Sequence, residues 1–164
     1  MRDMGRIGTV VLLAGSFLLA SGVRRQALAQ RALVATGART MDFGNLFPGV
    51  QSTILRTDAV RAGRFNLTGA RRLEVRIDFT LPAALVGPGG RTVPLQFAAG
   101  DGGFALANNI ATATAFDPRV QLVTRLSNRG RLFVWLGATA LPSPTQQAAT
   151  YTATITMTAA YTGN

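Results

Sequence analysis

The chain has 164 residues, of which 48% are hydrophobic, a size that fits one domain with a substantial core. Its 17 basic residues are all arginine, seven residues are acidic, the net charge is +10, and His, Cys and Lys are absent. This composition excludes a histidine general base, thiol and lysine nucleophiles, and the common zinc sites. Only Glu74 and Asp78 lie close together among the carboxylates, on a face shared with arginines. We therefore expect no enzyme, no cofactor and no metal site.

The amino terminus has the layout of a secretory signal peptide. A cationic start precedes an apolar run over residues 7–20, and a small-x-small triplet ending at Ala29 follows a polar stretch. The apolar run is shorter than the about 20 residues that a transmembrane helix needs. We expect residues 1–29 to be a signal peptide cleaved after Ala29, with a cut near residues 20–22 as the alternative.

Export would determine the compartment in which the remaining chain folds. Residues 30–164 are expected to form one domain in the periplasm, at the cell surface or outside the cell, with membrane contact only through an uncleaved signal segment. Because there is no Cys, burial and hydrogen bonding must hold the domain together without disulfides. Scattered arginines predict no specific nucleic-acid site, although a basic exported protein attracts polyanions in general.

Short alternating segments separated by turns fill the first half of this domain. The strands expected there are residues 33–36, 40–43, 52–57, 64–68 and 72–79. The last is the clearest, because its apolar residues share one face, from Leu73 to Phe79, and its charged residues share the other. The charges alternate in sign, which is typical of a solvated face with weak cross-strand ion pairs.

The middle of the chain has weaker patterns. Residues 87–90 and 100–103 are glycine-rich turns. Residues 93–97 alternate around Pro94, which lacks an N–H and therefore favours an edge strand. Residues 104–116 fit either a loop with a short strand or a helical turn.

Strong strand patterns return near the carboxyl end. Residues 120–126 and 131–138 flank a turn at residues 128–130 that predicts a hairpin, and residues 132–136 are apolar on both faces, as in a central strand. Residues 149–161 alternate threonine with apolar side chains, which predicts a half-buried closing strand.

Many short strands with turns between them predict an all-β fold. The expected architecture is a single immunoglobulin-like or pilin-like antiparallel β-sandwich. The alternative is an eight-stranded outer-membrane barrel, which needs an apolar outer band with aromatic girdles. Aromatics are only 7% of the chain, and arginine and threonine occupy the outward positions, so the sandwich is favoured.

Three segments carry a resemblance to a known family. They are residues 41–49 (MDFGNLFPG), residues 65–69 (FNLTG) and the closing run of residues 149–161. With them the mature chain resembles the bacterial exported family called domain of unknown function 4402. That family is similar to pilus subunits of the spore-coat-U type, which usually carry cysteines and polymerise by donating an amino-terminal strand. This chain departs from the family pattern at Ala149, where the family has glycine.

Two functional hypotheses follow from these observations. The first is an exported, non-enzymatic structural or adhesive surface protein, a pilus- or fimbria-like subunit. In it residues 31–36 either insert into a second copy of the chain or form the first strand of their own domain. The second is a periplasmic or secreted binding module for an anionic glycan or lipopolysaccharide, with Arg61, Arg64, Arg71 and Arg72 as candidate anion-binding residues. The expected partners are accordingly a second copy or an anionic surface polysaccharide.

Overall fold

Within residues 31–163, the part of the chain that the computed structural model describes, the chain forms twelve short β-strands joined by turns and loops. The expected signal peptide, residues 1–29, lies outside these described residues. The elements in chain order are β1 (Val34–Arg39), β2 (Ser52–Ile54), β3 (Gly63–Thr68), β4 (Glu74–Thr80), β5 (Ala84–Val86), β6 (Thr92–Gln96), β7 (Gly102–Ala105), β8 (Thr114–Phe116), β9 (Leu122–Arg125), β10 (Arg131–Leu136), β11 (Ala138–Ala140) and β12 (Thr156–Tyr161), with the single-turn 3-10 helices η1 (Pro88–Gly90) and η2 (Ile110–Thr112).

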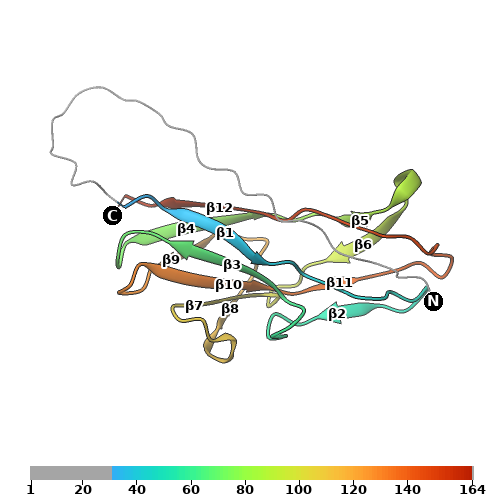
Figure 1. The fold of residues 1–164 in the computed structure, drawn as a ribbon, viewed down its shortest axis with the longest axis horizontal. Coiled ribbons are helices and arrows are strands. Elements are labelled where there is room, and N and C mark those ends of the chain that lie inside the picture. The colour runs from blue at the N-terminus through green and yellow to red at the C-terminus, as the bar shows by residue number, and fades with distance from the viewer. Residues whose placement is uncertain (1–30, 164) are drawn as a thin grey trace, which may run out of the picture.

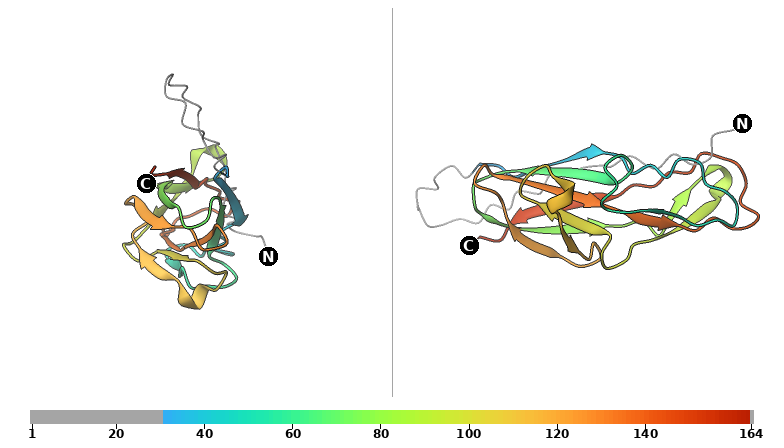
Figure 2. Two further views of the ribbon diagram at one scale, coloured as in Figure 1. Left: turned by 90° about the vertical axis from the view of Figure 1, so that its left-hand side faces the viewer. Right: turned by 90° about the horizontal axis from the view of Figure 1, so that it is seen from below.

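The strands form three antiparallel sheets that pack into a sandwich. Their orders are β1-β3-β10-β7-β8, β12-β4-β9 and β2-β11-β6-β5. Figure 1 shows an elongated molecule. The three-stranded sheet lies over the five-stranded sheet at one end, and the four-stranded sheet lies at the other. The end-on view in Figure 2 shows the layers enclosing a common interior. The predicted all-β antiparallel sandwich is confirmed.

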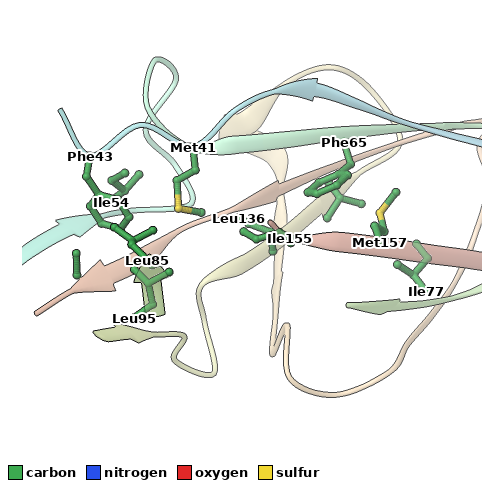
Figure 3. Packing of buried hydrophobic residues seen from close by; sticks show 14 of the residues in the cluster. Met41, Phe43, Ile54, Phe65, Ile77, Leu85, Leu95, Leu136, Ile155 and Met157 are labelled. Atoms are coloured by element: carbon green, nitrogen blue, oxygen red, sulfur yellow. The ribbon is translucent and has the colours of Figure 1, made fainter. Parts of the chain in front are cut away.

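One core runs the length of the sandwich. Figure 3 shows Ile54, Leu85 and Leu95 packed at one end and Ile77 and Met157 at the other. All of these side chains are buried, and none of the buried side chains among residues 31–163 is polar or charged. Apolar burial of this kind is the main force that holds the two layers together.

The clearest sequence patterns are confirmed. In β4, Val75 and Ile77 are fully buried while Arg76 is exposed, as the alternating faces predict. β10 lies in the middle of the five-stranded sheet, as expected of a strand that is apolar on both faces. Along residues 149–161, Tyr151 and Met157 are buried and the threonines lie at the surface or partly so.

The closing segment nevertheless changes partner along its length. Its regular ladder is β12, which pairs with β4 from the pair Thr156–Thr80 onward. Upstream of that point Thr152 forms an isolated bridge to Val86, with N–H to carbonyl distances of 2.9 and 2.7 Å in the two directions. The single long strand expected from the sequence is therefore wrong, because β4 ends where the upstream part begins.

The predicted hairpin around residues 128–130 is also wrong. The turn itself forms, since Gly130 has φ of +69° and its N–H donates to the carbonyl of Ser127 at 2.8 Å. β9 then pairs with β4, whereas β10 pairs with β3 and β7, so the turn connects the two layers. A turn determines only its own residues, and the longer ladder on β3 decides where β10 goes.

Residues 93–97 were expected on an edge, and this prediction is wrong as well. They lie mainly in β6, which is hydrogen-bonded to β11 on one side and β5 on the other. The structure accommodates Pro94 because β11 ends opposite it: the Pro94 carbonyl accepts from Leu141 N–H at 2.9 Å, one residue beyond the strand. The missing N–H therefore falls at the end of a ladder, where its loss costs least.

Three further segments differ from simple alternating strands. Residues 40–43 form no strand, although Met41 and Phe43 are buried in the core. β5 carries no alternation strong enough to predict it. Residues 104–116 contain both of the alternatives considered, the end of β7 and β8 as short strands and η2 as a helical turn.

Candidate functional site

The outer face of the five-stranded sheet carries an unusual set of side chains. Because Phe65 and Leu67 point into the core, the alternate residues Arg64 and Asn66 of β3 point outward. By the same alternation Phe133 and Trp135 of β10 lie on this face. The register places Arg39 opposite Arg64, Arg64 opposite Trp135, and Asn66 opposite Phe133.

A pocket lies on this face at the row that joins Arg39, Arg64 and Trp135. Its volume is about 160 Å³, and it is lined by Arg39, Ala59, Arg64, Asn108, Ile110 and Trp135. The last strand residue of β1, the segment before β3 and the loop around η2 thus supply its walls. Two guanidinium groups and one amide provide polarity, and the other three side chains are apolar.

Arg39 is held rigidly at one side of the pocket. Its Nε donates to the Ala62 carbonyl at 2.7 Å and its Nη1 donates to the Ala59 carbonyl, while Nη2 is buried with no partner. Burial and, next, the positive charge of Arg64 lower the pKa of Arg39, and Asp58 opposes this in part. The neighbouring guanidinium groups therefore repel each other in a partly desolvated place.

Arg64 is held more loosely. Its Nη1 donates to Oδ1 of the exposed Asn108 at 3.2 Å, and its Nε is buried with no partner. Within residues 31–163, three buried side-chain polar atoms lack a hydrogen bond: Arg39 Nη2, Arg64 Nε and Asn66 Oδ1. All three belong to this face, and buried unpartnered polar atoms are rare enough to need an explanation.

Another pocket adjoins this row along β3 and β10. It has a volume of about 150 Å³ and is lined by Asn66, Leu67, Thr68, Arg131 and Phe133. The rings of Phe133 and Trp135 stack with centroids 6.3 Å apart and planes at 27°, so an aromatic pair connects the two pockets along β10.

The four arginines proposed from the sequence do not converge. Arg64 lines the first pocket, and Arg61 lies just before β3 but is paired with Asp58 at 2.9 Å. Arg71 and Arg72 lie beyond the other end of β3, which ends at Thr68, about 13 Å along the strand from Arg64. There Arg72, with φ of +59°, donates through Nε to Asn128 at 2.7 Å.

Sequence reasoning overlooked Arg39 and the aromatic pair. The alternation of Phe133 and Trp135 within residues 132–136 is a visible signal, but by itself it predicts only a central strand that is apolar on both faces. Arg39 carries no comparable signal, because only the pairing of β1 with β3 places it beside Arg64.

Asp58, which lies near the pocket, and Asp117 each pair with an arginine close in sequence. Backbone N–H groups of Arg61 and Val60, then the Arg61 side chain, lower the pKa of Asp58 to about 2. The side chain and N–H of Arg119 lower the pKa of Asp117 to about 2. In the described part of the chain, no group of three or more acidic residues is arranged to hold a metal ion. Nor does any helix there have the length and hydropathy needed to cross a membrane.

Comparisons with known proteins identified no match to this chain among family models, curated proteins or solved structures.

Proposed function

We propose that this chain is an exported, non-enzymatic structural or adhesive surface protein whose copies associate by exchanging β1. The observation that supports this is the edge position and exposure of β1. It is the edge strand of the five-stranded sheet, it pairs with β3 alone among the described strands, and none of its residues is fully buried. Val34 is 48% exposed, and the pairing is irregular between Gly37 and Arg39.

Release of β1 would uncover the N–H and carbonyl groups along one side of β3. An unpaired strand edge pairs readily with an extended segment from another chain. The β1 of a second copy offers the same register and side chains as the strand it replaces. Exchange between identical chains therefore preserves the native contacts, and the free-energy difference between the two states is small.

Cysteine crosslinking tests this proposal, because the chain has no Cys of its own. Val34 and Thr68 are opposite each other on β1 and β3. We expect a mixture of the full-length single variants Val34→Cys and Thr68→Cys, purified separately and then oxidised, to form covalent mixed dimers. The double variant should give a ladder of crosslinked species, with filaments visible by electron microscopy.

The matched control is a mixture of the single variants Val34→Cys and Thr145→Cys. Thr145 is an exposed loop residue outside the β1–β3 ladder. This mixture should give few mixed dimers. If the double variant formed only internal bridges and the Val34–Thr68 mixture stayed monomeric, strand exchange would be rejected.

Export and the family resemblance stay predictions. Amino-terminal sequencing of the protein from fractionated cells checks the first: we expect the exported form to begin at Gln30. A form that keeps residues 1–29 in the cytoplasm would contradict it.

A second candidate function is a binding module for an anionic glycan or lipopolysaccharide. The specific observation in its favour is the pair of guanidinium groups, each with an unpartnered nitrogen, beside the pocket at Arg39 and Arg64. Retention of the full chain on a heparin column at about 0.15 M salt would support this function. Elution well below that salt concentration would indicate only generic charge attraction.

A further inference from the structure

We infer that the pocket lined by Arg39, Arg64, Asn108 and Trp135 binds the carboxylate of an acidic sugar residue. Arg64 closes on the carboxylate, and Arg39 provides a fixed positive charge. This inference rests on the second proposed function, for which it names the site and the class of ligand.

The pocket carries an excess of positive charge. Arg39 and Arg64 face each other across neighbouring strands, and the nearest carboxylate, Asp58, already accepts from Arg61 at 2.9 Å. Asp58 offsets the positive charge of Arg39 only in part, and two partly desolvated guanidinium groups without a full counterion are costly. An oxyanion placed between them relieves this repulsion and accepts hydrogen bonds from both.

Of the two arginines, Arg64 is the one whose side chain can move. The unpartnered nitrogens are covered, so an oxyanion reaches them only after a side chain shifts. Arg39 is tied to two backbone carbonyls, whereas Arg64 is tied only by a 3.2 Å bond to Asn108. Rotation of Arg64 towards the pocket breaks that one bond and leaves the exposed Asn108 amide free to bind the ligand as well. Such rotamer changes at a surface are fast.

The size and lining of the pocket indicate its kind of ligand. About 160 Å³ is below the usual volume of a site for a whole small molecule, so it suits one charged end of a larger ligand. A planar carboxylate matches the fork of a guanidinium group. Ala59 and Ile110 provide accessible apolar surface for the C–H groups of a sugar ring, and the buried Trp135 lies beneath them at the pocket.

The adjoining pocket extends the site to a polymer. It begins at Asn66, one outward position further along β3 and about 7 Å from Arg64 by strand geometry. There Asn66 Oδ1 is a buried, unpartnered acceptor that a sugar hydroxyl could reach once the amide turns outward, and Arg131 is a further cation. The two pockets therefore suit consecutive residues of an acidic polysaccharide.

Titration of the full chain with trigalacturonate tests the inference, with neutral galactotriose as the matched ligand. Binding is measured by calorimetry at about 0.15 M salt and by the emission of Trp135, which is the only tryptophan of the chain and lines the pocket. We expect trigalacturonate to bind and to change the emission, and galactotriose to do neither.

Variants locate the binding. Arg64→Ala should weaken trigalacturonate binding at least tenfold, and Arg64→Lys should restore it only in part because it keeps the charge but loses the fork. Arg71→Ala removes the same charge beyond the other end of β3 and should bind like the unaltered chain. Equal weakening by Arg64→Ala and Arg71→Ala would reduce the effect to net charge and overturn the inference.

The remaining outcomes separate the site from the function. If trigalacturonate bound with unchanged Trp135 emission and with no effect of Arg64→Ala, the inferred site would be wrong while the binding module stood. If none of trigalacturonate, heparin and lipopolysaccharide bound, both the inferred site and the binding-module function would be rejected. Displacement of trigalacturonate by inorganic phosphate or sulfate at equal concentration would overturn the assignment to an acidic sugar.

Discussion

The phenolic hydroxyl of Tyr161 donates a hydrogen bond of 2.8 Å to the backbone carbonyl of Arg31, 130 residues earlier in the chain. The same oxygen accepts from the N–H of Ala70 at 2.6 Å. One side chain of β12 therefore holds both the residues that lead into β1 and the turn that follows β3. These are the two strands whose separation the proposed exchange requires.

Tyr161→Phe should loosen β1. The substitution leaves Ala70 N–H and the Arg31 carbonyl without this partner, so we expect about 1 kcal/mol less stability to chemical denaturation. Mixed dimers in the crosslinking assay should form faster. Tyr151→Phe is the control, because the Tyr151 hydroxyl donates to the Gln147 carbonyl at 2.8 Å, away from β1. It should lower stability without changing exchange; equal rates in both variants would show that Tyr161 does not restrain β1.

Gly137→Ala should disrupt the crossing from β10 to β11. A Cβ at Gly137 would lie 2.3 Å from the carbonyl oxygen of Ile54 and 2.7 Å from the N of Arg56, and both are backbone atoms that cannot rotate away. We expect a loss of about 3 kcal/mol, measured by urea unfolding. Gly100→Ala, where a Cβ meets nothing within 4 Å, should change stability by less than about 0.5 kcal/mol. Similar losses at both positions would contradict the role of close approach at Gly137.

Phe65→Ala should remove a contact between the two layers. Phe65 is 1% exposed, and its ring meets that of Phe79 edge-on at 5.7 Å, which joins β3 to β4 across the core. Truncation of a buried phenylalanine costs about 3–5 kcal/mol, and the unfolding midpoint should fall accordingly. Phe47→Ala is the matched control at a side chain that is 65% exposed, and it should have little effect. A small loss at Phe65 would show that the layers do not depend on this contact.

Asp58 should make stability depend on pH in acid. Its Oδ1 accepts from the N–H groups of Val60 and Arg61 at 2.9 and 2.8 Å, and the pKa of Asp58 is about 2 in the folded chain against an ordinary value of 3.8. Because folding lowers the pKa, the stabilisation is present above pH 3.8 and is lost as the pH falls towards about 2. The loss should stay below about 1 kcal/mol because water screens the charge of this partly exposed carboxylate.

Asp58→Asn tests this assignment. The amide oxygen can still accept from the two N–H groups but carries no charge, so the free energy of unfolding should vary less between pH 4 and 2 than in the unaltered chain. An identical pH profile in the variant would assign the acid sensitivity to another carboxylate.

Local patterns were sufficient where burial alone decides the outcome. The alternation of β4 predicts that Val75 and Ile77 are buried, and the threonine alternation predicts the buried positions of Tyr151 and Met157. These local patterns did not predict which strands pair with each other. Pro94 lies in an interior strand, and Gly130 closes a turn between layers, because strand partners are chosen by ladders formed with residues far away in sequence.

The candidate site shows the same division. The sequence by itself determined that the chain is all-β, that it carries no His, Cys or Lys chemistry, and that Arg64 lies on the outward face of its strand, since alternation is a property of each extended segment. Only the tertiary structure decided that Arg39 meets Arg64 beside Trp135, and that Arg71 and Arg72 do not. Register across β1, β3 and β10 sets these neighbours, and it depends on how the whole sandwich buries its core.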